Sequence, residues 1–250
     1  MTASLMADEL LRATDVSFRY SQDSSPVLSG LSLTLLQGRK IAVVGRSGTG
    51  KTTLLSLLAG FLAPTTGRIG RQRAIDLRQG GKIGLVPQKD SLFPWKTVLD
   101  NLALTRSEKT GQALERIRGA VSDVGLPLSS LDAFPQSLSV GMRKRVEVVR
   151  AGLSGSKMLL ADEPFSALDQ ASATMTRDWL FRQVERQRSA LVLVSHDLID
   201  AVRFADELIV FSKAPSGTVK VVRNLAAKLP VHSSEAESFR VEIAKEMGII

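Results

Sequence analysis

A glycine-rich segment between a buried strand and an amphipathic helix constrains the fold of this chain more than any other feature. Residues 45–52 read Gly-Arg-Ser-Gly-Thr-Gly-Lys-Thr and fit the pattern G-x-x-x-x-G-K-[ST]. The apolar run 41–44 before this segment is typical of a strand buried on both faces of a parallel sheet. Four apolar residues recur at helical spacing after it: Leu54, Leu57, Leu58 and Phe61. The order strand, glycine loop, helix predicts the first unit of an α/β nucleotide-binding fold.

The residues of this loop suit the binding of a phosphate chain. Glycines let the backbone approach an anion closely, so that successive N–H groups and the helix N-terminus point at it. Lys51 is then placed to reach the β- and γ-phosphates, and the Thr52 hydroxyl to ligate Mg²⁺. An ordinary glycine turn is the simpler interpretation, but the four fixed positions match by chance only about once in a hundred chains of this length.

A second group of polar residues ends another buried strand. Residues 158–163 read Met-Leu-Leu-Ala-Asp-Glu, and open α/β sheets bind ligands at the carboxyl ends of their strands. We expect Asp162 to hold the metal ion through water, and Glu163 to act as general base toward an attacking water. An acidic pair alone is a weak signal, because strands commonly end in charged turns. Together with the phosphate loop it becomes a strong one.

Composition narrows the classes of protein that remain. The 250 residues carry a net charge of +8 and contain no cysteine. The charge favours an anionic ligand, nucleic acid or an acidic membrane surface without choosing among them. The lack of cysteine excludes disulfides, thiolate catalysis and cysteine-bound zinc, and fits a reducing compartment. The longest nearly apolar run, 54–63, is about half of the roughly 20 residues that span a bilayer. The N-terminus lacks a secretory pattern. We therefore expect any membrane part to come from another chain.

The remaining pattern predicts one α/β domain over residues 1–250, with a mostly parallel sheet, an antiparallel β part at the N-terminus and a helical insertion at about 97–156. Residues 11–20 indicate a half-buried strand that ends with Val16, Phe18 and Tyr20 on one face. Alternating leucines indicate a further antiparallel piece: Leu31, Leu33 and Leu35. Further strands are expected at 158–161, 190–194, 208–211 and 218–222. Helices are expected at 112–124, 141–153, from 170 and from 197, with a cap at Thr97 and Asp100 and a packing helix formed by Phe239, Ile243 and Met247.

The helix at 141–153 carries charged residues beside its apolar stripe. Glu147 is spaced to pair with Arg143 and with Arg150. Three consecutive basic residues, Arg143, Lys144 and Arg145, indicate a solvated helix face.

The segment before this helix carries a resemblance to a known family. Residues 138–142, Leu-Ser-Val-Gly-Met, resemble the LSGGQ signature of ABC transporter ATPases, which are P-loop NTPases. Further motifs of that family occur in order over nearly the whole chain, namely an aromatic ring at Tyr20, the Q-loop glutamine at Gln88, the D-loop at 166–169 and the switch histidine at His196. Each motif alone has an ordinary explanation: Tyr20 could simply pack, and Gln88 and His196 could be polar loop residues.

The resemblance implies a role for each of these residues. Gln88 would meet Mg²⁺ and the attacking water, His196 would steady the γ-phosphate as the bond breaks, and Tyr20 would stack on adenine. Ser139 and the amides near Gly141 form a second anion site, where the γ-phosphate held by another copy would bind, so that two ATP molecules join a homodimer. The implied ATP contacts are Tyr20, Gly45, Ser47, Gly48, Gly50, Lys51, Thr52, Thr53, Ser139, Gly141 and Asp169, and the implied Mg²⁺ ligands are Thr52, Gln88 and Asp162. Val140 and Met142 depart from the consensus: valine restricts the backbone and adds bulk beside the nucleotide, and methionine removes a side-chain amide.

A partner is needed to use the free energy of ATP hydrolysis. The segment 92–95, Leu-Phe-Pro-Trp, offers apolar contacts to an integral membrane permease, although packing within this domain would explain it equally well. Residues 92–101 together with 141–143 resemble the nitrate, sulfonate and taurine branch of bacterial importers. That resemblance implies a small anion as cargo, a periplasmic or lipid-anchored solute-binding protein, and a peripheral position at the cytoplasmic face of the inner membrane.

Three other classes fit parts of the sequence. The positive charge favours a soluble ABC-type ATPase that acts on nucleic acid, but the coiled-coil insertions or paired ATPase halves of such proteins are missing, so we expect no nucleic acid partner. A P-loop kinase or GTPase would lack the ordered signature and D-loop, and no N-K-x-D motif is present. A regulator that binds ATP without hydrolysing it would not need Glu163 and His196.

Overall fold

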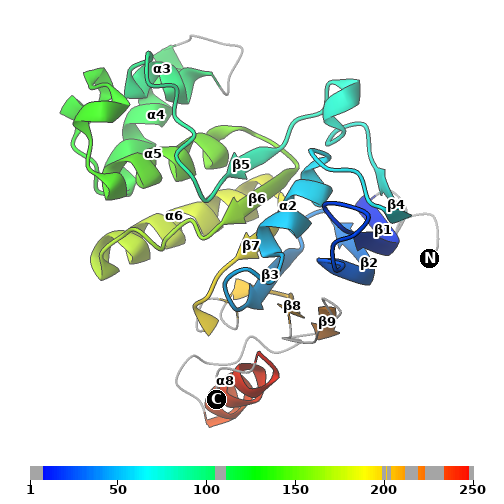
Figure 1. The fold of residues 1–250 in the computed structure, drawn as a ribbon. Helices are drawn as coiled ribbons and strands as arrows, with labels where there is room; N and C mark the ends of the chain where they lie inside the picture. Colours follow the sequence, from blue (N-terminus) through cyan, green and yellow to red (C-terminus); the bar gives the residue numbers. More distant parts are fainter. Residues whose placement is uncertain are drawn as a thin grey trace.

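The computed structural model describes residues 8–104, 111–198, 201, 204–211, 219–222 and 234–247. Within these residues a six-stranded sheet runs in the order β5-β6-β7-β3-β8-β9 (Figure 1). Its strands are β3 (Lys40–Gly45), β5 (Gly84–Val86), β6 (Met158–Asp162), β7 (Ala190–Val194), β8 (Glu207–Phe211) and β9 (Val219–Val222). All neighbouring strands are parallel except β8 and β9. The central β3, β6 and β7 are buried throughout, which explains their continuous apolar sequence.

An antiparallel sheet precedes and flanks this core. It consists of β1 (Glu9–Phe18), β2 (Leu28–Leu36) and β4 (Thr66–Arg71), with β1 in the middle. The alternating leucines of β2 are buried, as their period of two predicts. The expected strand at 11–20 is too long, because β1 ends at Phe18 and Tyr20 is 67% exposed. Tyr20 therefore leaves the sheet and is free to meet a ligand.

The helix after the glycine loop, α2 (Lys51–Ala59), is shorter than its apolar pattern predicts. Gly60 adopts a left-handed conformation at φ 83° and donates its N–H back to Leu57, which ends the helix. Phe61 therefore lies past the helix end and is 61% exposed, so its assignment to this helix is wrong.

The helical part lies between β5 and β6 in the chain and occupies the opposite side of the sheet from the antiparallel strands (Figure 1). It contains α3 (Val98–Ala103), α4 (Gly111–Asp123), α5 (Val140–Leu153) and the short 3-10 helices Leu128–Asp132 and Pro135–Ser137; another 3-10 helix, Leu77–Gln79, precedes β5. Thr97 caps α3 by accepting from the N–H of Asp100, as predicted. α6 (Gln170–Gln187) packs against this part in one hydrophobic core. That the whole chain forms a single domain stays a prediction.

The C-terminal helix α8 (Ser234–Glu246) covers another region of the sheet. Ile243 and Met247 are buried together with Val44 and Leu208, and Phe239 packs against them, which confirms the packing helix. The helix expected from 197 falls mostly outside the described residues, as does the first residue of the strand expected at 218–222.

The charged face of α5 differs from its prediction. Glu147 is fully buried and pairs with Lys144 at 2.9 Å, whereas Arg143 bonds Asp90 at 2.7 Å. The expected pairs of Glu147 with Arg143 and Arg150 are not the ones that form, and Lys144 is not solvated, being only 3% exposed. The reason is that residues 87–91 cover this face of the helix, a contact that helical spacing alone does not reveal.

Candidate functional site

The loop between β3 and α2 is held in a conformation that only glycine allows at two positions. A Cβ on Gly50 would lie 2.6 Å from a methyl carbon of Val27, and the backbone there has φ 105°. A Cβ on Gly45 would lie 2.7 Å from the Cβ of Phe211. Because both positions are closed to any side chain, the backbone itself forms the wall of the loop.

Lys51 places a buried positive charge at this loop. Its side chain is 7% exposed, and Nζ donates to the carbonyls of Gly45 at 2.9 Å and Arg46 at 2.8 Å. Burial lowers the pKa of Lys51, while the nearby Glu163 and Asp162 act in the opposite direction. The first turn of α2 and this ammonium together favour an anion at the loop.

Thr52 and Asp162 join the loop to the end of β6. The Thr52 hydroxyl donates to Oδ2 of Asp162 at 2.6 Å, and Asp162 is 3% exposed. Burial raises the pKa of the Asp162 carboxyl, and the hydrogen bond from Thr52 partly offsets this. A hydroxyl and a carboxylate are hard oxygen donors of the kind that Mg²⁺ prefers, and Mg²⁺ takes its other ligands from water and substrate phosphates.

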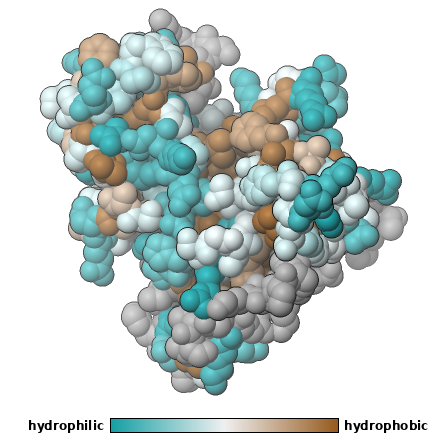
Figure 2. Space-filling view, viewed as in Figure 1, coloured by the Kyte–Doolittle hydropathy of each residue, from teal (hydrophilic) through white to brown (hydrophobic). Residues whose placement is uncertain are grey.

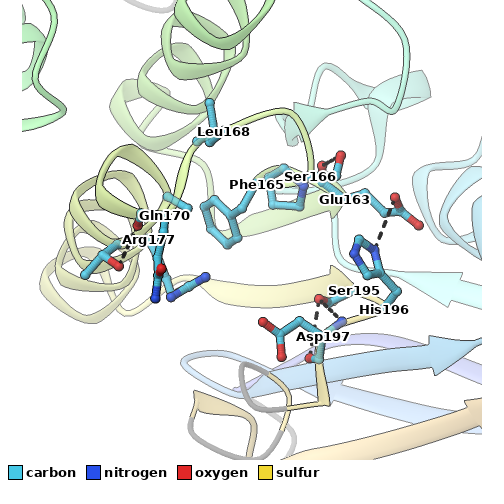
Figure 3. A pocket seen from close by; sticks show the side chains of 12 residues that line it. Glu163, Phe165, Ser166, Leu168, Gln170, Arg177, Ser195, His196 and Asp197 are labelled. Carbon is cyan, nitrogen blue, oxygen red and sulfur yellow. Dashed lines mark hydrogen bonds and ion pairs between the residues drawn. The ribbon is translucent and has the colours of Figure 1, made fainter.

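Glu163 and His196 face each other beside this pair. A carboxylate oxygen of Glu163 lies 3.5 Å from Nδ1 of His196, and Figure 3 shows the two side chains meeting from the ends of β6 and β7. Glu163 has φ 49°, a left-handed conformation that is costly for a residue with a side chain, and its N–H donates to Val194 at 3.0 Å. The strained backbone aims the carboxylate away from the strand and toward the histidine.

A pocket of about 470 Å³ opens next to Glu163 and His196 (Figure 3). Phe165 and Arg177 line it, with the guanidinium 5.4 Å from the ring centre. Neither residue belongs to a motif that the sequence reveals. The spacing of Ala173, Thr174 and Arg177 on one face of α6 was the available signal.

Tyr20 lies over the first turn of α2. Its hydroxyl is 2.8 Å from the hydroxyl of Thr53, and its ring meets Phe18 edge to face at 5.0 Å. The ring is thus fixed at one end and exposed on its face, which suits stacking on a flat aromatic ligand.

The remaining predicted residues lie on other elements. Gln88 follows β5 and is exposed. Ser139 caps α5 by accepting from the N–H of Met142 at 3.2 Å, and a Cβ on Gly141 would lie 3.3 Å from the carbonyl of Ala167. Asp169 caps α6, and the hydrogen bond from the backbone of Ser172 lowers the pKa of its carboxyl.

The structure therefore gathers one part of the predicted site and separates another. Lys51, Thr52, Asp162, Glu163 and His196 meet at the carboxyl ends of β3, β6 and β7, where open α/β sheets bind ligands. Ser139 and Gly141 stand at the N-terminus of α5, in the helical part. Their role as nucleotide contacts stays a prediction, as do the roles of the other site residues.

The family model described as ABC transporter matches residues 28–166, more than half of the chain. The chain belongs to the ABC transporter family. As an ABC transporter ATP-binding protein it binds and hydrolyses ATP, and it is the ATPase subunit of an ABC importer.

Individual relatives support this placement. The formylaminopyrimidine import ATP-binding protein ThiZ of Halalkalibacterium halodurans is 36% identical over 213 residues, which cover 84% of this chain and 82% of ThiZ. The taurine import ATP-binding protein TauB of Pseudomonas putida is 34% identical over 222 residues, covering 84% and 81%. Among solved structures, a dimeric bacterial ABC transporter cassette, MJ0796, superposes with a TM-score of 0.70 at 25% identity, covering 80% of this chain and 94% of that one. Among the described residues, none of the helices has both the length and the hydropathy to cross a membrane.

Proposed function

We propose that this importer ATPase couples hydrolysis of MgATP to uptake of a small anion such as a sulfonate, taurine or nitrate. The main support for the ATP site is the Thr52–Asp162 hydrogen bond of 2.6 Å. This bond joins the phosphate loop to the end of β6, which Glu163 follows directly. Similarity to the taurine importer ATPase supports the cargo class, and similarity to ThiZ names formylaminopyrimidine as the competing cargo.

The chemical step uses residues that already lie together. Lys51 would leave the carbonyls of Gly45 and Arg46 and bind the β- and γ-phosphates, and Thr52 with Asp162 would hold Mg²⁺, which when bound neutralises phosphate charge. Water attacks the γ-phosphorus while Glu163 takes its proton, and the bond to the bridging oxygen breaks toward ADP. His196 donates a hydrogen bond to the transferring group and stabilises the added charge.

The second half of the site comes from another copy of the chain. The tip of α5 offers the Ser139 hydroxyl, free helix N–H groups and the positive end of the helix dipole. Because this tip belongs to the helical part, we propose that it binds the triphosphate held on a second protomer's phosphate loop. Val140 is 54% exposed there and would lie beside that nucleotide. The similar bacterial cassette MJ0796 was solved as a dimer, which supports the pairing of two protomers.

The segment before α3 is proposed as the permease contact. Phe93 and Trp95 are 40% and 70% exposed, with their rings paired at 5.4 Å. Packing within the domain would have buried the Trp95 ring, so its exposure favours a partner. Figure 2 shows that hydrophobic side chains on the viewed face gather in the hollow between the helical part and the antiparallel sheet. A permease helix seated on the Phe93–Trp95 segment would hold the subunit at the cytoplasmic face of the membrane.

Uptake measurements in whole cells test this proposal. A strain lacking the chain should fail to accumulate labelled taurine or an alkanesulfonate, and the wild-type chain should restore uptake. Trp95→Ala should restore much less uptake, although the purified variant hydrolyses ATP at the wild-type basal rate. Normal anion uptake in the deletion strain, together with lost uptake of formylaminopyrimidine, would refute the cargo class and leave the ATPase assignment intact.

A further inference from the structure

A buried charge pair on α5 has no part in the reaction described above. Nζ of Lys144 lies 2.9 Å from a carboxylate oxygen of Glu147, and the two side chains are 4% and 0% exposed. A buried ion pair is weak evidence for stability, because the cost of removing two charges from water offsets most of their attraction. The other groups that these charges contact indicate what the pair does.

Both charges bond the segment that follows β5. Lys144 donates to the carbonyl of Pro87 at 2.9 Å and to that of Gln88 at 3.3 Å. One oxygen of Glu147 accepts from the N–H of Ser91 and from its hydroxyl, the latter at 2.8 Å. Two residues on one helix face therefore fix both ends of the segment 87–91.

Two arginines of α5 extend this network. Arg150 donates to the carbonyl of Ser91 at 2.9 Å, and Arg143 donates to the carboxylate of Asp90 at 2.7 Å. Arg143 also donates to the carbonyl of Leu138 at 2.7 Å, immediately before the cap of the helix. The segment 87–91 is thus attached along α5 from its first turn to its third.

This attachment links a predicted Mg²⁺ ligand, Gln88, to a predicted nucleotide contact, Ser139. Lys144 follows Ser139 by five residues on the same helix, a rise of about 7.5 Å. Because a helix of this length moves as a stiff unit, the backbone of Gln88 and the Ser139 tip keep their separation. The family resemblance implies that Gln88 meets Mg²⁺ and the attacking water at the nucleotide of its own protomer, and in the proposed function Ser139 binds the nucleotide of the other.

We propose that Lys144 and Glu147 are positioning residues that hold the Gln88 loop on α5, so that docking of the Ser139 tip and placement of Gln88 occur as one movement. The inference rests on the proposed function. It predicts that loss of the pair weakens turnover through Gln88 and leaves nucleotide binding at the phosphate loop intact.

The test replaces both charges at once with Lys144→Met/Glu147→Leu, because a single substitution would leave one buried charge unpaired. We expect kcat for ATP to fall about tenfold and KM to change less than about twofold, since only the placement of a catalytic loop is lost. In a Gln88→Ala background the same double substitution should cause no further loss of kcat. The matched control is Glu115→Gln/Arg118→Met, which removes an exposed ion pair of the same spacing on α4 and should leave both constants unchanged.

Two results would overturn the proposal: a wild-type kcat in the double variant, or losses that multiply with that of Gln88→Ala. If the double variant shows no cooperative unfolding transition, Ser91→Ala replaces it, with an expected kcat loss of about threefold that is again absent beside Gln88→Ala. Hydrogen exchange at the Ser91 N–H, which donates to Glu147, measures this hydrogen-bond network without ATP. The amide should exchange faster in the double variant than in the wild type. A wild-type chain that shows this protection but hydrolyses no ATP would contradict the proposed function alone.

Discussion

The phosphate-loop side and the α5 side of the molecule are built by different means. On the first, Gly45 and Gly50 let backbone segments approach closely, and a short hydrogen bond joins the first turn of α2 to the end of β6. On the second, the buried charges of Lys144 and Glu147 hold a loop that lies more than fifty residues earlier in the chain. The comparison teaches that close backbone packing fixes one half of the site, whereas buried charges fix the other half.

Removal of the buried Lys51 charge from the phosphate-loop side should have the largest effect on ATP turnover. Lys51→Ala removes the buried ammonium, and ATP turnover should fall about a thousandfold because a preorganised cation at the transferring phosphate is lost. Phosphate release measured over a range of ATP concentrations checks this. Lys157→Ala, which removes an exposed lysine, is the control and should match the wild type. Wild-type turnover in Lys51→Ala would show that the phosphate loop takes no part in the reaction.

Glu163→Gln tests the base on the same side. The substitution keeps the shape of the side chain but removes its ability to take a proton, so kcat should fall by about a hundredfold or more. Equilibrium binding of ATP should change less than about twofold, since the substitution leaves Lys51 and the N–H groups of the phosphate loop unchanged. Single-turnover hydrolysis beside a nucleotide-binding titration separates the two quantities. Equal losses in binding and turnover would contradict the base role.

Two glycines of the helical part test how tightly α5 is packed compared with α4. A Cβ on Gly152 of α5 would lie 2.6 Å from the ring of Trp179, whereas a Cβ on Gly119 of α4 would meet nothing within 4 Å. Gly152→Ala should therefore destabilise the fold by about 1–3 kcal/mol through overpacking. Gly119→Ala should stabilise it by about 0.5–1 kcal/mol through helix propensity. Chemical denaturation of both variants measures the free energies of unfolding, and changes of the same sign would show that the α5–α6 contact is looser than described.

The smallest expected effect concerns the cap of α6. The folded protein depresses the pKa of Asp169, so the carboxylate contributes stability above its unfolded-state pKa and loses that contribution as pH falls through the folded-state value. Asp169→Ala should lower the midpoint of thermal unfolding slightly at neutral pH, and the difference should shrink in acid. Asp169→Asn keeps a capping acceptor, so its midpoint of thermal unfolding should lie between those of the wild type and Asp169→Ala. Unfolding scans over a pH series test this, and a difference that grows in acid would contradict the capping role.

The sequence predicts the phosphate-loop side well for a physical reason. The glycines, Lys51 and Thr52 are contiguous, and the buried strands that carry Asp162 and His196 read as continuous apolar runs. Backbone geometry and burial act over a few residues, so they leave a pattern in a single sequence. The family assignment and the α/β fold predicted from these motifs are confirmed.

The prediction is wrong where distant segments meet. Helical spacing paired Glu147 with Arg143 and Arg150, but the segment 87–91 covers this face and changes the partners. Phe61 continued an apolar period, yet the left-handed Gly60 had already ended the helix. In each case the outcome depends on a contact or a backbone turn that periodicity does not describe.

Mixing two inactive variants tests the central claim most directly. Lys51→Ala damages the phosphate loop and keeps the α5 tip, whereas Ser139→Glu damages the exposed tip with a repelling charge and keeps the loop. Each homodimer has two damaged sites, but a mixed dimer has one intact site, formed by the loop of one chain and the tip of the other. The account predicts that equimolar mixing restores ATP turnover that neither variant shows alone. Mixtures that stay as inactive as their components at every ratio would contradict it.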